Sequence, residues 1–564
     1  MNDERLSRRR FLKLTAGSMV ALAAGSVLIG CGDDDDEPAA ATPAATPRRQ
    51  ADATATPEVA TAEATTPVAT TAATSTPAAT EAPTEEPAAE SSGGGTVRIG
   101  GLAGAGGPID PRAVTSALSY LAVNSVFEFA ALHGDGELEP GAAESITSNE
   151  DATVWTLTLR EGLRFHDGSP VRAQDVVASI AFMGDFETSP TYALQWIDVD
   201  WANLRAIDDR TVEVPLLRPR ADYLESVFAL YVPIIKEGTT DFMVPIGSGP
   251  YKVESNDGAD GIVVVRNDDW WEFTPSVERV INVPINDPAA RINALKSGEI
   301  DIAYQLPPAV VRAEEGNDDI TVVQSSLGGA AMIFSMNTSL PPFDNPEVRE
   351  ALRLSVDRQT MINSVLLGQG QLGNDLVGLG FPGYNDQLPQ RTHDLERAQA
   401  LFAANGISEL DILASDVAPG LVASAEVLAA QLAAIGVTLN IEELPADAFF
   451  ADIPRLLNTP FMTMYFSNRP PSVHLPQFVG STAVVNVTAF ATPEFDAAML
   501  ATQSTTDEEE RLQHLLEAQA IEWEQGGTIV WGFSPMIIAH SPRVENVKVI
   551  SDGLIEFEDL VLRA

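Results

Sequence analysis

The sequence is poor in residues that form disulfide bonds and metal clusters. It contains one cysteine, Cys31, and six histidines among 564 residues. A single cysteine excludes an intrachain disulfide bond and a cysteine-cluster metal site. The histidines lack the short spacings of metal ligands, so we expect no metal site and no cofactor. His166 stands beside a turn in "FHDG", and we expect it to hydrogen-bond a loop.

Positive charge is also scarce. The chain has 34 lysines and arginines against 80 aspartates and glutamates, a formal charge of -46. Such a polyanion repels nucleic acid and the anionic faces of membranes, so neither is an expected partner. We interpret the acidity as a source of solubility. Attraction of cationic ligands into a cleft and adaptation to a salty host stay open as alternatives.

The common signatures of catalysis are missing. The sequence has no G-x-x-x-x-G-K-[ST] phosphate loop, no H-E-x-x-H and no G-x-S-x-G. The glycine-rich stretch "GGLAGAGG" lacks the G-x-G-x-x-G spacing. These gaps favour a binding protein over an enzyme.

The N-terminus has the pattern of an export signal. "SRRRFLKL" (7–14) carries an arginine pair, and an apolar run rich in small residues follows to Gly30. The run is too short for a membrane helix, so residues 1–30 are predicted to be a signal peptide. The arginine pair resembles the twin-arginine signal, and "LIGC" (28–31) resembles a lipobox. We therefore expect Cys31 to carry a lipid.

Residues 31–95 are predicted to form a disordered tether. Their composition is dominated by Ala, Thr, Pro, Glu and Ser, without an apolar period. Such a segment cannot bury enough apolar surface to offset its ordering entropy. Together with a lipid at Cys31, it places the protein on the outer, extracytoplasmic face of the cell membrane.

From Thr96 onward the pattern is that of a mixed α/β protein, and its length predicts at least two domains. "TVWTLTLREGLRF" alternates as a strand does, and after it we expect a helix with Ser169 as N-cap and Pro170 at its first position. Residues 345–368 are predicted to be one helix capped by Asn345. A second helix is expected over 394–406. A βαβ unit follows it, which implies a parallel strand pair.

Several segments in chain order resemble the extracellular solute-binding proteins of family 5, the peptide- and nickel-type receptors of ABC importers. They are "IDP" (109–111), "ELEPGAAES" (137–145), "TVWTLTLREGLRFHDGSPVRAQDVVASI" (153–180), "PIGSGPYKV" (245–253), "RINALKSGEIDIA" (291–303), "MNTSLPPFDNPEVREALRLSVDR" (336–358) and "FDAAM" (495–499).

The resemblance implies a two-lobed periplasmic-binding-protein fold (type II, cluster C-like), in which two lobes close over a ligand. Lobe one is expected over 96–325 together with 526–564, with an extra subdomain near 140–245, and lobe two over 326–525.

The resemblance also implies ligand-binding residues. The loop after "IDP" corresponds to Thr115, Ser116 and Ala117. "SLGGAAMIFSMN" (326–337) is expected to be a strand entering lobe two, and its small residues Gly328, Gly329 and Ala330 suggest a wide pocket. A tight passage that returns the chain to lobe one is expected at four residues: Gly247, Ser248, Gly249 and Pro250.

One segment departs from the family pattern. In "YFSNRPPSVHL" (465–475) the aromatic of the family motif corresponds to Tyr465, but Asn468 stands where peptide receptors have an aspartate for the ligand's α-ammonium. An amide supplies no charge to an ammonium group. The adjacent Arg469 suits a carboxylate or phosphate, or an acidic side chain of the protein itself. We expect weak selection for a free peptide N-terminus.

The expected function is therefore a monomeric receptor that delivers peptides or peptide-like solutes to an ABC permease. Two alternatives stay open. One is the same fold with a metal chelate, an oligosaccharide or an opine-like acid as ligand, and the other is an enzyme or adhesin on this scaffold.

Overall fold

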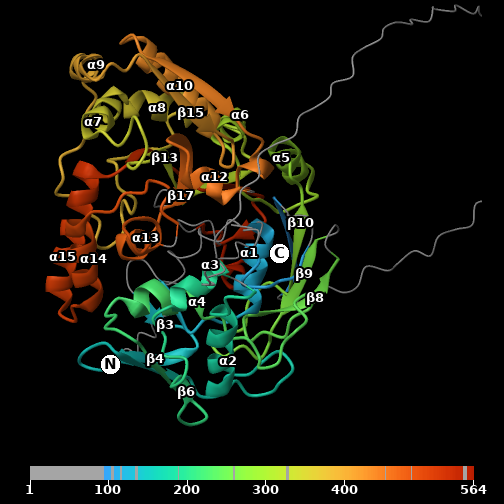
Figure 1. The fold of residues 1–564 in the computed structure, drawn as a ribbon. Helices are drawn as coiled ribbons and strands as arrows, with labels where there is room; N and C mark the ends of the chain where they lie inside the picture. Colours follow the sequence, from blue (N-terminus) through green and yellow to red (C-terminus); the bar gives the residue numbers. More distant parts are fainter. Residues whose placement is uncertain are drawn as a thin grey trace, which may run out of the picture. The chain divides into compact units, whose positions relative to one another are not determined.

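The structure is a computed structural model (Figure 1). It describes residues 94–102, 107–114, 117–133, 138–188, 190–257, 261–325, 329–450, 452–483, 485–549 and 555–563. The predicted signal peptide, Cys31 and most of the tether, as well as Thr115 and Ser116, lie outside the described residues. Among the described residues, no helix has the length and apolar character needed to cross a membrane.

A seven-stranded sheet forms the first part of the fold. Its strand order is β12-β19-β11-β1-β10-β9-β8, and the central β1 runs parallel to both of its neighbours. The strands are β1 (Thr96–Gly101), β8 (Tyr251–Asn256), β9 (Ile262–Arg266), β10 (Arg279–Pro284), β11 (Ile302–Ala303), β12 (Thr321–Gln324) and β19 (Ile537–His540). The helices near it are α1 (Ala117–Val126), α5 (Pro288–Ser297) and α6 (Pro308–Ala313).

A four-stranded sheet in the order β4-β5-β7-β6 builds a separate subdomain. Its elements are β4 (Ala143–Ser148), β5 (Val154–Leu159), α2 (Ala173–Met183), α3 (Pro190–Ala193), a 3-10 turn (Leu194–Trp196), β6 (Arg205–Ala206), β7 (Thr211–Pro215), a π-helical turn (Leu224–Phe228) and α4 (Ala229–Tyr231). β5 buries alternate residues, as predicted: Trp155, Leu157 and Leu159 face a core of their own with Val176 and Ile180 of α2. We call the first sheet and this subdomain the first lobe.

The second lobe surrounds a six-stranded sheet in the order β14-β18-β13-β17-β15-β16. Its strands are β13 (Ala330–Met336), β14 (Gln371–Leu372), β15 (Glu409–Ala414), β16 (Thr438–Glu443), β17 (Phe461–Ser467) and β18 (Thr528–Ser534). Its helices are α7 (Pro346–Ser355), α8 (Arg358–Val365), α9 (Leu395–Ala404), α10 (Leu421–Ala433), α11 (Ala446–Phe449), α12 (Ile453–Leu457), α13 (Pro471–Phe478), α14 (Pro493–Ser504) and α15 (Glu508–Gln525). β15 and β16 pair in parallel, which confirms the βαβ prediction.

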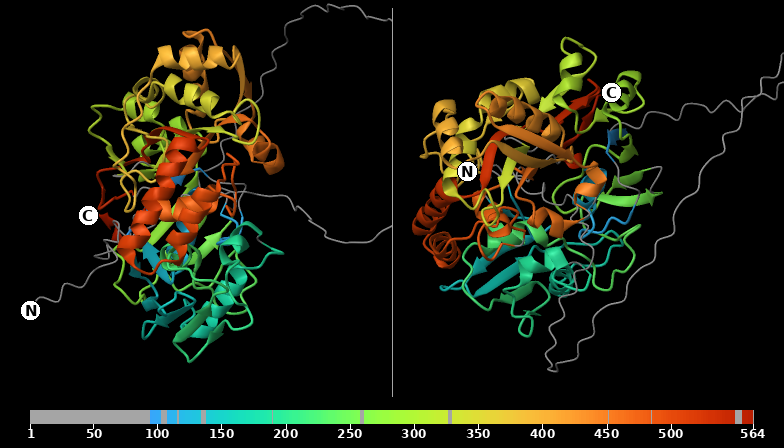
Figure 2. Two further views of the ribbon diagram at one scale, coloured as in Figure 1. Left: turned by 60° about the vertical axis from the view of Figure 1, so that its left-hand side comes forward. Right: turned by 45° about the horizontal axis from the view of Figure 1, so that its top comes forward.

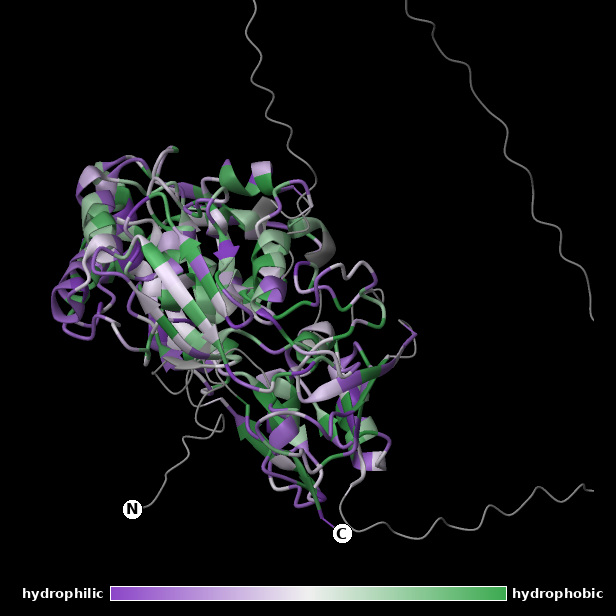
Figure 3. Ribbon diagram, turned by 90° about the horizontal axis from the view of Figure 1, so that it is seen from below, coloured by the Kyte–Doolittle hydropathy of each residue, from purple (hydrophilic) through white to green (hydrophobic). Residues whose placement is uncertain are grey.

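Two short antiparallel strand pairs complete the fold. β2 (Ala131–His133) pairs with β3 (Leu138–Pro140), and β20 (Val544–Glu545) pairs with β21 (Val561–Leu562). A 3-10 turn (Phe557–Asp559) precedes β21. Figure 3 shows hydrophobic and hydrophilic residues mixed along the strands and helices, with several outer loops hydrophilic.

The chain passes between the two large sheets twice, from β12 to β13 and from β18 to β19. Figure 2 shows the subdomain, in teal, and the yellow to orange part of the second lobe from two further sides. The first passage falls where lobe two was expected to begin. The second differs from the expectation that lobe one resumes at residue 526, because β18 pairs with β13 along its length. The return passage therefore lies between Ser534 and Ile537.

Two helix predictions need correction. Ser169 is not an N-cap, because its N–H and hydroxyl bind Asp167 in a turn (3.0 and 2.6 Å), and α2 begins only after Arg172. Instead, Asp175 accepts the N–H of Arg172 (2.9 Å) and closes the first turn.

The predicted helix over 345–368 is two helices. Asn345 caps α7 as expected by accepting the N–H of Glu347, but Val356 is extended and ends the helix. Asp357 then caps α8 by accepting the N–H of Thr360 (3.1 Å). A capping aspartate inside an apolar helical pattern favours this restart.

Candidate interlobe ligand site

The segment 465–475 is the end of a strand followed by a helix. β17 ends at Ser467, and α13 begins at Pro471 after Pro470, whose fixed φ suits a helix start. The polar residues between them are buried: Asn468 is 1% exposed and Arg469 is 4% exposed. The segment is therefore a junction packed inside the protein.

Asn468 is bound to backbone on every side. Its Oδ1 accepts the N–H of Gly378 (2.9 Å), its Nδ2 donates to the carbonyl of Leu379 (3.0 Å), and its own N–H donates to the carbonyl of Gly329 (3.1 Å). The side chain thus ties two loops of the second lobe together. A carboxylate at this position would face the Leu379 carbonyl oxygen without a proton to donate.

Arg469 carries a positive charge into the protein. Its Nη1 donates to Oε1 of Gln477 on α13 (3.1 Å), and its Nε donates to the carbonyl of Ser467 (3.3 Å). The guanidinium lies 5.4 Å from the centre of the Phe478 ring, within range of a cation–π interaction.

Gln477 crosses from the second lobe to the first. Its Nε2 donates to the hydroxyl of Tyr231 on α4 (3.0 Å), and the Tyr231 ring meets Tyr192 edge-on, with ring centres 6.0 Å apart. Burial raises the pKa of Tyr231, so its hydroxyl stays neutral. One helical turn earlier, Val473 packs into the core of the subdomain. The two lobes therefore meet through an apolar contact and a hydrogen bond beside a buried cation.

His474 completes this cluster as a neutral ring. It is 2% exposed and packs against Phe466 and Phe478, with ring centres 5.0 and 5.1 Å away. Burial, with a further contribution from the charge of Arg469, lowers its pKa well below the ordinary value. In the described part of the chain, its Nδ1 has no hydrogen-bond partner.

Comparison with known proteins identifies the architecture. The family of bacterial extracellular solute-binding proteins, family 5 Middle, matches residues 137–481. The chain belongs to this family. It is a solute-binding receptor of the kind that serves ABC importers, with the two-lobed α/β fold of periplasmic binding proteins.

Relatives of this receptor match along most of their length. Heme-binding protein A of Haemophilus influenzae is 26% identical over 470 residues, which cover 76% of this chain and 85% of the relative. Glutathione-binding protein GsiB of Salmonella typhimurium is 23% identical over 480 residues, covering 81% of this chain and 92% of the relative. The structure of DppA from Helicobacter pylori, solved with the peptide STSA, superposes with a TM-score of 0.71 at 22% identity, covering 84% of this chain and 99% of DppA.

The receptor brings most of its predicted site residues to one end of the second sheet. Ala330 pairs with Ser467, two residues after Tyr465, and Gly329 bonds Asn468. Burial raises the pKa of Tyr465. Ala117 begins α1, which packs on the first sheet in the other lobe.

The passage at Gly247–Pro250 is not a crossing between the large sheets, because it joins the subdomain to β8 within the first lobe. A Cβ on Gly247 would lie 2.0 Å from the carbonyl oxygen of Val126, and one on Gly249 would lie 2.7 Å from that of Ser125. Both glycines are therefore required by close approach of two backbones.

His166 holds this passage, as expected of a loop-binding histidine. Its Nδ1 accepts the N–H of Gly247 (3.2 Å), and its Nε2 lies 3.1 Å from the carbonyl of Gly249. Burial lowers its pKa to about 4, so the neutral form with the proton on Nε2 satisfies both contacts.

Sequence reasoning missed Tyr231, Gln477 and His474. The one available signal was helical spacing, because Val473 and Gln477 stand four residues apart and share a face of the helix after the proline pair. Tyr231 lies 246 residues from Gln477, so nothing local connects them. Within the described residues, no group of three or more His, Cys, Asp or Glu side chains forms a metal site.

Proposed function

We propose that this receptor binds a peptide or peptide-like solute between its lobes and delivers it to the permease of an ABC importer. One observation carries the proposal: Arg469, Gln477 and Tyr231 form a buried polar chain across the junction of the two lobes. A solute held at this junction would contact both lobes, so its binding would be coupled to their closure. Relatives named for glutathione and heme, and a DppA structure with a peptide, support a peptide or a solute of similar size as the ligand.

We further propose that the site does not select a free peptide N-terminus. The position at which peptide receptors carry an aspartate holds Asn468, whose amide is bound to the backbone of Gly378 and Leu379. The charged side chain beside it is Arg469, which attracts carboxylates and repels ammonium groups. Blocked, neutral or acidic peptides fit this chemistry best.

An acidic solute that is not a peptide is the second candidate. Arg469 brings a positive charge to the junction, and a carboxylate of an opine-like acid or an anionic metal chelate would be attracted by it. An oligosaccharide would find fewer charged partners here. We expect none of these ligands to be chemically changed by the protein.

A panel of ligands separates these candidates. A ligand that binds only the folded protein raises its melting temperature. We expect the exported, detergent-extracted protein to be stabilised by N-acetylated and acidic tripeptides. A shift with a nickel chelate or an opine-like acid, and none with any peptide, would replace the peptide proposal by the second candidate.

We propose that the protein leaves the cell through a twin-arginine signal and is anchored by a lipid on Cys31, with residues 31–95 as tether. It would then act as a monomer on the extracytoplasmic face of the membrane. Mass spectrometry of the N-terminal peptide should find a lipidated Cys31, and Cys31→Ala should release the protein from the membrane fraction.

A further inference from the structure

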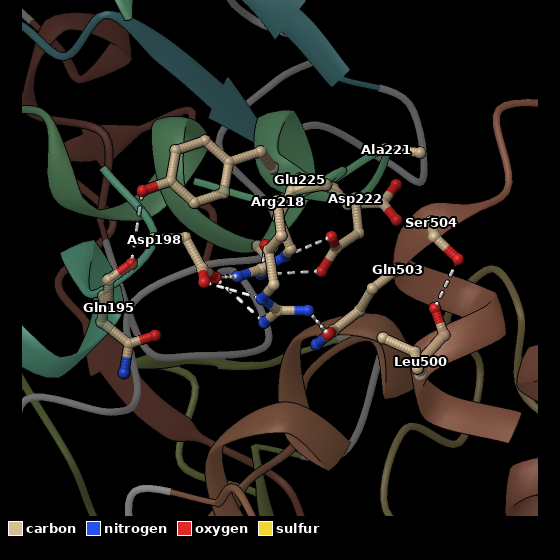
Figure 4. Close-up of polar contacts among 12 residues, drawn as sticks. Gln195, Asp198, Arg218, Ala221, Asp222, Glu225, Leu500, Gln503 and Ser504 are labelled. Carbon is tan, nitrogen blue, oxygen red and sulfur yellow. Dashed lines mark hydrogen bonds and ion pairs between the residues drawn. The ribbon is translucent and has the colours of Figure 1, made fainter. Parts of the chain in front are cut away.

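A second set of polar contacts joins the lobes away from Arg469, at the segment 218–225 of the subdomain (Figure 4). The N–H of Ala221 donates to the carbonyl of Gln503 on α14 (2.6 Å), and Nη1 of Arg218 donates to Oε1 of the same glutamine (2.8 Å). On α15, Nη1 of Arg511 donates to Oε1 of Glu225 (2.8 Å).

The subdomain side of these contacts is rigidly built. Asp198 accepts both Nε and Nη2 of Arg218 (2.7 and 2.9 Å), which aims the remaining Nη1 at Gln503. Arg220 donates to Asp198 and binds Asp222 through two hydrogen bonds (2.7 and 3.0 Å). Two-point arginine–carboxylate pairs fix the direction of the remaining donors. Nη1 of Arg218 is therefore already in position to donate to Gln503 when the lobes meet.

The opposite side is fixed to the second lobe. The last carbonyls of α15 accept arginine N–H groups of that lobe: Trp523 from Arg391 (2.8 Å), and Gln525 from Arg349 (3.0 Å). The partial negative charge at the C-terminal end of the helix dipole also attracts these arginine side chains. Because α15 is anchored in this way, Arg511 near its first turn moves with the second lobe.

We propose that Ala221, Arg218 and Glu225 with Gln503 and Arg511 form a latch that stabilises the closed form of the receptor without touching the solute. The inference rests on the proposed function, since it assumes that the lobes separate to admit a ligand. A contact made only in the closed form shifts the open–closed equilibrium toward closure by its own free energy. The latch thus raises affinity for every ligand by the same factor and slows ligand release.

The amide of Ala221 reports the latch directly, because its hydrogen-bond acceptor belongs to the other lobe. Hydrogen–deuterium exchange of the full-length protein without ligand, followed by mass spectrometry of the peptide that spans 216–223, measures how often the latch opens. We expect this amide to be protected in the wild type. Gln503→Leu and Arg511→Gln should each speed its exchange about threefold, and the pair about tenfold, because each removes one partly buried hydrogen bond.

Arg210→Gln is the matched control. Arg210 stands in the same subdomain and pairs with Glu144 and Glu161 of that subdomain only. The substitution Arg210→Gln removes the same charge as Arg511→Gln but changes no contact with the other lobe, so exchange at Ala221 should stay as in the wild type. An equal effect of Arg210→Gln would show that looseness of the subdomain, and not the latch, controls the amide.

Ligand release supplies the second readout. With a ligand found by the thermal-shift panel, the two latch variants should release it about threefold faster, while the melting temperature of the ligand-free protein falls by no more than about 2 °C. Unchanged exchange and unchanged release would overturn the latch while leaving the receptor function intact. Faster exchange at Ala221 in a protein that binds no solute would leave the latch and overturn the proposed function.

Discussion

The contact of Gln477 with Tyr231 and the latch around Gln503 both join the second lobe to the subdomain, but they hold charge differently. Beside Gln477, the guanidinium of Arg469 donates to an amide and a carbonyl oxygen. At the latch, Arg218 is held by a carboxylate of its own lobe before it reaches across. An acidic solute would change the electrostatics of the first contact and leave the second unchanged. On our proposals, the first contact recognises the ligand and the second sets how firmly the lobes stay closed.

The largest effect is expected at Asn468, which fixes the backbone next to Arg469. Asn468→Asp replaces a buried amide donor with a carboxylate facing the Leu379 carbonyl, and should cost about 2–4 kcal/mol of unfolding free energy. Urea denaturation measures this loss. Asn363→Asp, at an exposed position of α8, should change stability by less than about 0.5 kcal/mol. Equal stability of the Asn468 variant would show that the junction is not a rigid support.

The two contacts should respond differently to the ligand's charge. Arg469→Gln should weaken binding of an acidic peptide about tenfold or more and that of its amidated, neutral form far less. Arg218→Gln should weaken both about threefold, because its contact does not involve the solute. Calorimetric titration of both variants with both peptides measures the four affinities. If the loss of affinity caused by Arg218→Gln depends on the charge of the peptide as strongly as the loss caused by Arg469→Gln does, the two contacts do not have separate roles in recognition and closure.

The smallest expected effect is a pH dependence confined to the latch. Burial raises the pKa of Glu225 to about 7, against an opposing contribution from Arg511 and reinforcing ones from Asp222 and Glu508. A carboxyl whose pKa is higher in the closed form than its ordinary value of 4.5 favours closure below that value. This contribution is lost as the pH rises through about 7.

Exchange at Ala221 should therefore slow modestly between pH 8 and pH 5 after correction for the intrinsic rate. Glu225→Gln should remove this pH dependence. The contact of Gln477 with Tyr231 should add no pH dependence in this range, because burial raises the pKa of Tyr231 and lowers that of His474. A pH dependence that survives Glu225→Gln would place the titrating group elsewhere.

Local patterns sufficed for much of the fold. The alternation in β5, the capping Asn345 and the βαβ unit of β15 and β16 are each written in a short stretch of sequence, and the structure confirms them. The two errors in helix prediction arose where a polar side chain had two possible partners. Ser169 bonded its own turn, and Asp357 began a second helix.

The site was less accessible to prediction than the fold. The motif around Asn468 drew attention to the end of β17, but it did not predict that the Asn468 amide would bind the loop at Gly378, 90 residues earlier. The sequence of β18 is that of a buried strand, which could pair in either large sheet. Only its pairing with β13 assigns it to the second sheet. Contacts between distant segments, such as Gln477 with Tyr231, depend on how the lobes pack, and no local pattern encodes them.

The most direct test of the account is calorimetric titration of the wild-type protein with one tripeptide in two forms, one with a free N-terminus and one N-acetylated. Because Asn468 is engaged by backbone and Arg469 carries the charge at the junction, we predict that acetylation changes the dissociation constant by less than about threefold, or strengthens binding. A preference for the free amine of about 100-fold, which corresponds to about 2.7 kcal/mol, would contradict the account.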